Sequence, residues 1–329
     1  MNIRELLQKY KQGETDFSGL QLPGGDLTGV ELIGIILSSA NLQGSNFTFA
    51  HLNRVDLTKA QLAESDLSGA NLTQSNLSEA NLQGANLHGA VLQRANLRRA
   101  DITLTTLVDA NLIDVDLRGA DLRGAVLTGA CLRGANLQQE KKTLYTNLQS
   151  ANLSRSDLQR ANLRGGNLTG ANLGGANLKT ANLRRVKLSK AELSYANLQD
   201  ALVADADLVD AKLIGADLTN ANLLRTRLIQ VDLTNAILQG AKLSRAIMAR
   251  ANLYQANLCS AQINGADLSQ ANLRGADLRN AGLVDTFLAK ADLTDADLRG
   301  ANLSRADLMS ANLRGANLEG AILPDGKIL

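Results

Sequence analysis

Hydrophobic residues recur every five positions along almost the whole chain. From residue 16 to residue 323 the sequence repeats the pattern Ala-Asx-Leu-x-x, and the last two positions are mostly Ser, Thr, Arg, Gln or Gly. The central position is Leu in 55 of 61 such pentapeptides, and its six replacements are also apolar: Phe17, Phe47, Ile102, Val203, Met248 and Ile263. A column that accepts only apolar side chains is predicted to be buried.

A period of five residues matches neither an α-helix nor a continuous β-strand, but it suits a short strand followed by a corner. Ala and Leu are two positions apart, so in an extended chain both point to one side while the Asx between them points outward. The two remaining residues turn the chain. The repeat therefore predicts an all-β solenoid with Leu and Ala inside.

The residue two positions before each centre indicates how many sides a coil has. This residue is usually Ala, and its exceptions after residue 30 are Ile35, Ser45, Val55, Ser65, Ser75, Thr105, Val115, Thr146, Ser156, Gly166, Val186, Thr226, Val231 and Thr286. All but Val231 fall on alternate pentapeptides, which a three-sided coil would spread over every wall. Two sides enclose no core, so four sides are the simplest solution.

The repeats Ala40-Asn41-Leu42-Gln43-Gly44, Ala70-Asn71-Leu72-Thr73-Gln74 and Ala301-Asn302-Leu303-Ser304-Arg305 resemble the pentapeptide-repeat family. The resemblance covers roughly residues 15–323 and implies a right-handed quadrilateral β-helix with four pentapeptides per coil. Members of this family are especially abundant in cyanobacteria, and for most of them the resemblance implies no defined activity. Some resemble regulators that act through protein contacts, including in cell differentiation.

The first residues are predicted to close one end of the solenoid, because a terminal coil exposes apolar edges. Within the predicted cap at residues 1–14, a helical lid is expected over residues 2–12, with Gly13 placed to end it. The apolar residues of this segment have the spacing of an amphipathic helix: Ile3, Leu6, Leu7 and Tyr10.

A single β-helix domain is predicted over residues 15–323. Residues 324–329 are expected to form a C-terminal cap or tail that begins with a Pro-Asp-Gly turn. Residues 140–145 have six positions where five are expected, and the alternation of small residues continues across them. We therefore expect this insertion to replace one side of a coil as a local bulge, either as a tolerated surface insertion or as a functional contact.

Composition narrows the functional classes. Aromatic residues make up 2% of the chain, and the formal net charge is +2. These values favour neither an acidic mimic of nucleic acid nor a strongly basic nucleic-acid binder. No run approaches the length of a membrane span, and the first residues are charged, so we expect no membrane association, no secretory signal and a cytoplasmic protein.

Side chains that could carry catalysis are few and scattered. His51 and His88 are outward on separate coils, and Cys131 and Cys259 are more than six coils apart, too far for a disulfide. The Asp, Ser and Gly residues mostly occupy positions that the repeat explains, and no phosphate-binding or dinucleotide motif is present. We expect neither an enzyme nor a metal or cofactor site.

One candidate contact surface is a basic wall in the second part of the chain. Its residues are Arg164, Arg184, Arg185, Arg225, Lys242 and Arg245, and the insertion is expected on the same side. Nucleic-acid recognition usually adds stacking aromatic residues to positive charge, and this wall has none, which disfavours nucleic acid. An ordinary solvated surface is the alternative interpretation.

A second candidate surface consists of apolar residues at positions where turns should be polar: Leu202, Val209, Ile214, Leu224 and Ile229. Exposed apolar residues can mark a contact site. Alternatively, these side chains pack against one another along the stack of coils, because equivalent positions lie about one strand spacing apart.

The sequence therefore predicts a non-enzymatic, rod-like scaffold or regulatory protein that binds another, unidentified protein. The alternative is the gyrase-protecting branch of the family, whose members resemble duplex DNA and bind a topoisomerase. Such mimicry needs a dense acidic surface in place of phosphates, and this chain is nearly neutral. A homodimer through the open β edge of a terminal coil is a further hypothesis that the sequence does not decide.

Overall fold

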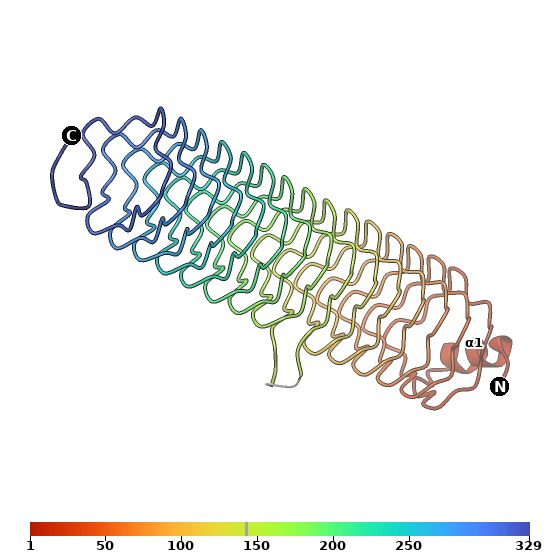
Figure 1. The fold of residues 1–329 in the computed structure, drawn as a ribbon. Coiled ribbons are helices and arrows are strands. Elements are labelled where there is room, and N and C mark those ends of the chain that lie inside the picture. Colours follow the sequence, from red (N-terminus) through yellow and green to blue (C-terminus); the bar gives the residue numbers. More distant parts are fainter. Residues whose placement is uncertain (142–143) are drawn as a thin grey trace. The chain divides into compact units, whose positions relative to one another are not determined.

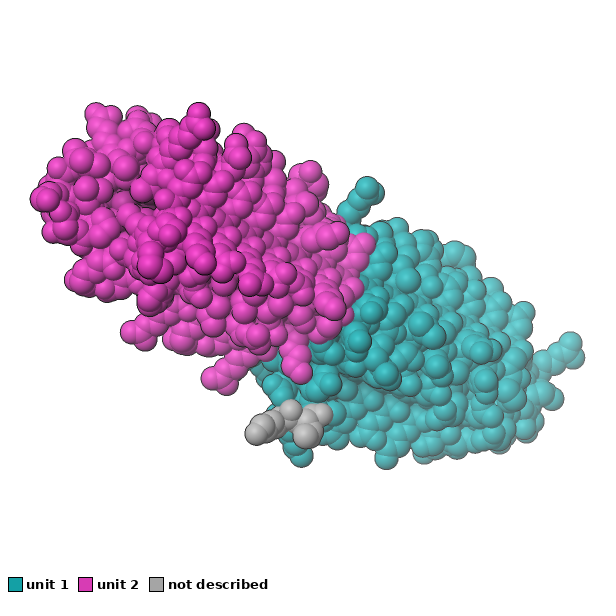
Figure 2. Space-filling view, viewed as in Figure 1, with its two compact units in different colours: residues 1–167 teal, residues 168–329 magenta. Residues whose placement is uncertain are grey.

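The computed structural model describes residues 1–141 and 144–329, which form two compact units, residues 1–167 and 168–329 (Figure 2). Each unit is a right-handed quadrilateral β-helix, so the predicted fold class is confirmed (Figure 1). Lys142 and Thr143, which belong to the predicted insertion, lie outside the described residues. The single domain over residues 15–323 stays a prediction.

Successive coils stack in parallel with a register of 20 residues. In the first unit Asp16 bridges Ile36, and in the second unit Glu192 bridges Lys212. Each coil therefore has four walls, and each wall contains every fourth pentapeptide. We name the walls by their first central residue: Phe17, Leu22, Leu27 and Leu32 in the first unit, and Leu168, Leu173, Leu178 and Leu183 in the second.

The last two residues of each pentapeptide form a corner. At one corner the N–H of Ala196 donates to the carbonyl oxygen of Leu193 at 3.0 Å, three residues back. Tyr195, inside this turn, has a φ of 59°. A positive φ at the third turn position is typical of type II turns and favours glycine, which explains why glycine is frequent at this position of the repeat.

The Asx residue before each centre has a structural role. Oδ1 of Asp232 accepts a hydrogen bond from the backbone N–H of Thr234 at 3.0 Å and another from its hydroxyl at 2.6 Å. Asn252, one coil on, donates its Nδ2 to the same oxygen at 3.2 Å. The side chain thus fixes the turn and connects neighbouring coils, so outward Asx residues are required by the fold itself.

Leu and Ala side chains fill the interior of each unit. Leu72 and Ala70 in the first unit, and Leu253 and Ala251 in the second, are 0% exposed. Ser75, which replaces Ala on one wall, donates its hydroxyl to the carbonyl oxygen of Leu72 at 2.6 Å. Such local bonds make a hydroxyl acceptable in the core, and no buried side-chain nitrogen or oxygen of the described residues lacks a partner.

The helix α1 (Ile3–Lys11) covers the first coil, as predicted (Figure 1). Asn2 caps it by accepting the N–H of Glu5 at 3.0 Å. Leu6 is 0% exposed, and the hydroxyl of Tyr10 donates to the carbonyl oxygen of Ile33 at 2.9 Å. The helix therefore contributes both an apolar contact and a hydrogen bond to the edge of the first coil.

The chain reverses after the last strand. The N–H of Gly326 donates to Leu323 at 2.9 Å, and Ile328 forms an antiparallel bridge with Ile322. Ile328 and Leu329 remain 71% and 59% exposed. The tail therefore pairs with one edge strand and leaves its apolar side chains in solvent, and the homodimer through this end stays a prediction.

The insertion does not replace a side of a coil, so that prediction is wrong. Across it the register lengthens from 20 to 26 residues on every wall, as the bridges from Asp121 to Asn147 and from Asn136 to Asn162 show. The six residues are an addition at a corner, and the coil keeps four walls. The alternation is misleading because the exceptions to Ala change walls: Val55 and Ser65 lie on the Phe17 and Leu27 walls, whereas Thr146 and Ser156 lie on the Leu22 and Leu32 walls.

Two side chains of the insertion, Glu140 and Leu144, contact neighbouring coils of the first unit. The carboxylate of Glu140 pairs with Arg98 and, at 3.2 Å, with Arg99, and the Glu140 side chain is only 8% exposed. Burial opposes its ionisation, but hydrogen bonds from the two guanidinium groups outweigh burial and hold the pKa of Glu140 below its ordinary value. Leu144 lies over Gly119, where its Cγ would be 3.0 Å from an added Cβ.

Replacing Glu140 by Gln is expected to loosen the insertion, because a neutral amide cannot balance two guanidinium groups. Since the pKa of Glu140 is lowered, the wild-type ion pairs are intact at neutral pH and are lost only as the pH falls through this lowered pKa. Tryptic cleavage after Lys141 at neutral pH should therefore accelerate several-fold in the variant. The control variant Glu79→Gln removes an exposed partner of Arg99 at 3.8 Å and should leave the cleavage rate unchanged. Equal cleavage rates in the wild type and both variants would contradict a role of Glu140 in holding the insertion.

Candidate interaction surfaces

Five of the six predicted basic residues lie on one wall of the second unit, the Leu183 wall. Parallel bridges connect Leu202 to Asn222 and Asn222 to Lys242 along this wall. Arg164 belongs to the first unit, where its carbonyl oxygen accepts the N–H of Gln139 at 2.8 Å. The side chains that the structure places on the Leu183 wall are all exposed: Arg184, Arg185, Arg225, Lys242 and Arg245.

Ion pairs neutralise part of this wall. Arg225 donates to the two carboxylate oxygens of Asp205 at 2.7 and 3.0 Å, and this hydrogen bonding lowers the pKa of Asp205. Arg305 binds Asp285 in the same way at 2.6 and 2.7 Å. Exposed pairs of this kind contribute little stability but cancel charge. The positive charge offered to a partner is therefore concentrated at Arg184, Arg185, Lys242 and Arg245.

The five predicted apolar residues are all half-buried and lie on three different walls. Val209 and Ile229 occupy equivalent positions of neighbouring coils on the Leu168 wall, and Leu202 and Leu224 lie on the Leu183 wall. Ile214 lies on the Leu173 wall. Because each wall is flat, a partner seated on one wall meets at most two of these side chains. The structure thus brings four of these residues together in two pairs and places Ile214 on a third wall, rather than forming one patch.

The structure shows a larger apolar surface that the sequence reasoning missed. On the Leu168 wall, Ile247, Phe287 and Met309 are 40%, 52% and 65% exposed. Bridges through Asp267 place Ile247 and Phe287 in one column, two coils apart. With the apolar residues of the adjacent column, they define what we call the Leu168 stripe: Ile229, Ile247, Ala249, Phe287, Ala289 and Met309.

A departure from the repeat is the signal that could have found this stripe. Ile247 and Phe287 stand at the Asx position, where their hydrocarbon side chains cannot accept the turn N–H. On the same wall Asp267 accepts the N–H of Ser269, and Asp307 that of Met309, both at 2.9 Å. Each apolar replacement forfeits a hydrogen bond worth about 1 kcal/mol and exposes apolar area, which is a local cost to the fold.

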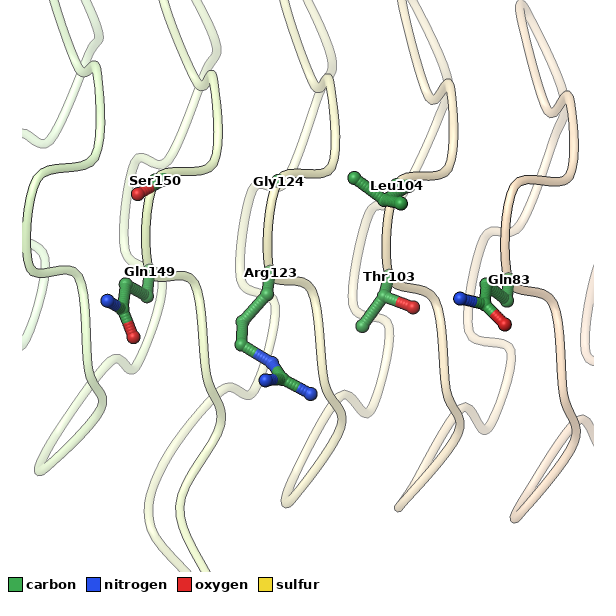
Figure 3. Close-up of a pocket in the computed structure, with 7 residues that line it drawn as sticks. All are labelled: Gln83, Thr103, Leu104, Arg123, Gly124, Gln149 and Ser150. Atoms are coloured by element: carbon green, nitrogen blue, oxygen red, sulfur yellow. The ribbon is translucent and has the colours of Figure 1, made fainter.

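A shallow hollow of about 450 Å³ lies on the Leu22 wall of the first unit (Figure 3). Leu104, 64% exposed with a φ of 58°, lies beside Gly124, and Arg123 is paired with Asp121 at 2.7 Å. Four polar side chains line the hollow on successive coils: Gln83, Thr103, Arg123 and Gln149. None of the lining residues is His, Cys, Asp or Glu, so this is a hydrogen-bonding surface rather than a proton-transfer site.

The remaining candidate groups are dispersed. His51 and His88 are exposed, and Cys131 and Cys259 are free and half-buried. Across the described parts of the chain, no three His, Cys, Asp or Glu residues gather where they could hold a metal ion. Within the same residues, no helix has both the length and the apolar character needed to cross a membrane.

Replacing Ile247 by Asn should raise the free energy of unfolding by about 1 kcal/mol, because the amide oxygen can accept the N–H of Ala249. Ile237 is 39% exposed at the same repeat position on the Leu178 wall, so Ile237→Asn should give a similar gain. Chemical denaturation of both variants measures the effect. A loss of stability confined to Ile247→Asn would mean that Ile247 serves the fold rather than a contact.

The family model for pentapeptide repeats matches in overlapping segments that together cover residues 13–139, 146–203 and 206–323, leaving out the insertion. No protein with a curated description matches significantly.

Among solved structures, similarity extends to HetL, a pentapeptide repeat protein involved in heterocyst differentiation regulation in the cyanobacterium Nostoc sp. strain PCC 7120. The two are 32% identical over 100% of both chains, with a TM-score of 0.23. Rfr23 from the cyanobacterium Cyanothece 51142 is 33% identical over 32% of this chain and 58% of its own, with a TM-score of 0.16. QnrB1, a plasmid-mediated fluoroquinolone resistance protein, is 18% identical over 60% of this chain and 90% of its own, with a TM-score of 0.28. Because the family model matches nearly the whole length, the chain belongs to the pentapeptide repeat family.

Proposed function

We propose that this chain is a non-enzymatic scaffold or regulatory protein whose flat walls bind a partner protein. One observation carries the proposal: central Leu and small Ala residues such as Leu163, Ala161, Leu223 and Ala221 are 0% exposed, so side chains fill the interior. Charged and apolar groups are displayed outward at fixed spacing. A filled interior leaves the outer walls as the place where function is exerted.

The state of the carboxylates supports a non-catalytic role. The hydroxyl and backbone N–H of Thr294 bond to Asp292, and those of Thr28 bond to Asp26, which lowers the pKa of both carboxyls. General acid–base catalysis near neutral pH needs groups whose pKa is raised toward that range. These carboxylates instead remain ionised and accept hydrogen bonds from the turns.

The Leu183 wall supports a protein partner with an acidic surface. Arg184, Arg185, Lys242 and Arg245 are exposed, and none of them occupies a position that the repeat requires to be basic. No aromatic residue stands among the outward positions of this wall, so base stacking is not available.

Affinity capture with the full chain from an extract of the source cells, followed by mass spectrometry, is expected to recover a specific partner protein. The double variant Arg184→Glu/Arg245→Glu should lose most of that capture, because reversed charges repel an acidic surface. Arg274→Glu/Arg314→Glu carries the same charge change on the exposed Leu173 wall and serves as the matched control. Recovery of no protein by the wild-type chain would refute the proposed function.

A gyrase supercoiling assay addresses duplex mimicry. With a net charge of +2, the chain lacks the anionic density that replaces phosphates, so stoichiometric protein should leave supercoiling unchanged. Potent inhibition, or protection of gyrase from a quinolone, would reverse the assignment in favour of a topoisomerase partner.

A further inference from the structure

The Leu168 stripe gives the proposed function a specific form. We infer that this stripe binds an amphipathic α-helix of a partner protein whose apolar face is flanked by acidic residues; the inference rests on the proposed function. The stripe runs over four coil steps from Ile229 to Met309, which corresponds to ~19 Å at the usual strand spacing. A helix of about 13 residues has the same length.

The backbone of the wall favours a helix over an added strand. The N–H of Ile247 donates to Thr226 at 2.9 Å and its carbonyl oxygen accepts from Leu228 at 2.7 Å. Phe287 is paired in the same way with Ala266 at 2.9 Å and with Leu268 at 2.8 Å. A strand added to a sheet needs free backbone groups at an edge, and these are already used between coils. A helix satisfies its own backbone and binds through side chains alone.

The spacing of the exposed side chains also suits a helix. Ile247 and Phe287 are two coils apart, ~10 Å at the usual strand spacing, which is close to the ~10.5 Å advance of seven helical residues. Asp267 lies between them in the same column, and the small residues Ala249, Ser269 and Ala289 lie in the adjacent column, all half-buried. Large side chains alternating with small ones form the ridges and hollows into which the apolar face of a helix can pack.

Basic side chains stand at both corners of the wall. Arg245 is exposed at the corner that precedes it, and Arg250 and Lys290 are exposed at the corner that follows. Of the carboxylates on this wall, Asp267 and Asp307 lie along the stripe, and each accepts a turn N–H at 2.9 Å. Their side chains are short, whereas the long basic side chains can extend past the stripe. The charges at the corners therefore complement acidic residues on both flanks of a bound helix.

The probe for this inference is a synthetic amphipathic peptide of about four helical turns, with Leu at i, i+3, i+4 and i+7 spacing and Glu on both flanks. Its binding to the full chain is measured by fluorescence anisotropy. Ile247→Asn/Phe287→Asp returns both positions to the repeat consensus, so thermal denaturation should show an intact fold. This variant should weaken binding at least tenfold, whereas Ile237→Asn, the matched exposed position on the Leu178 wall, should leave binding unchanged.

Charge is tested with Arg250→Glu/Lys290→Glu, which should weaken binding of the Glu-flanked peptide and strengthen binding of a Lys-flanked version. The inference is overturned if the wild-type chain does not bind the Glu-flanked peptide, or if the consensus-restoring variant binds it equally well. It is also overturned if phosphatidylserine vesicles bind through Ile247 and Phe287 while the peptide does not. If the Ile247→Asn/Phe287→Asp variant still captures the partner protein and the Arg184→Glu/Arg245→Glu variant does not, this inference is overturned while the proposed function stands.

Discussion

The structure depends on the backbone hydrogen bonds between coils at a fixed register. Leu193 donates to Lys212 at 2.7 Å, and the equivalent bond recurs at Leu213, Leu233 and Leu253. This register stacks each central Leu on the next and fixes the outward positions at one strand spacing. It also engages the backbone groups of the strands that it joins, so recognition on the walls falls to the outward side chains. The surface is therefore a rigid display whose content varies from coil to coil.

Much of that display is committed to the fold. Asx residues such as Asp232 and Asn252 accept or donate hydrogen bonds that close corners and connect coils. An acidic or amide side chain at such a position is thus weak evidence of function. The informative positions are those where the repeat is broken at a cost, as at Ile247 and Phe287. In a repeat protein, exceptions to the consensus carry more functional information than the consensus does.

The sequence predicted the fold well because its period encodes local geometry directly. The five-residue spacing, the outward Asx and the amphipathic start predicted the walls, the core and α1 (Ile3–Lys11). The prediction for the insertion was wrong because it assumed that the replacements of Ala stay on the same walls along the chain. The bridge between Asp121 and Asn147 shows that six residues were added at a corner without a new side. The sequence predicted only part of the Leu168 stripe, because it did not show which apolar side chains are exposed together on one wall. Ile229 was identified, but Phe287 was not, because the hydrogen bond from the turn N–H to the Asx side chain was not evident from the sequence, so an apolar residue at that position did not stand out.

The register of 26 residues across the insertion shows how this fold tolerates added length. Because the extra segment leaves and rejoins the coil at a corner, the strands that follow it in the first unit return to the walls they would have joined without it. Corners are thus neutral points for lengthening, whereas a change of even one residue within a strand would turn Leu toward solvent. Loops grafted at other corners, tethered by a buried carboxylate as Glu140 is, would add recognition elements without disturbing the rest of the array.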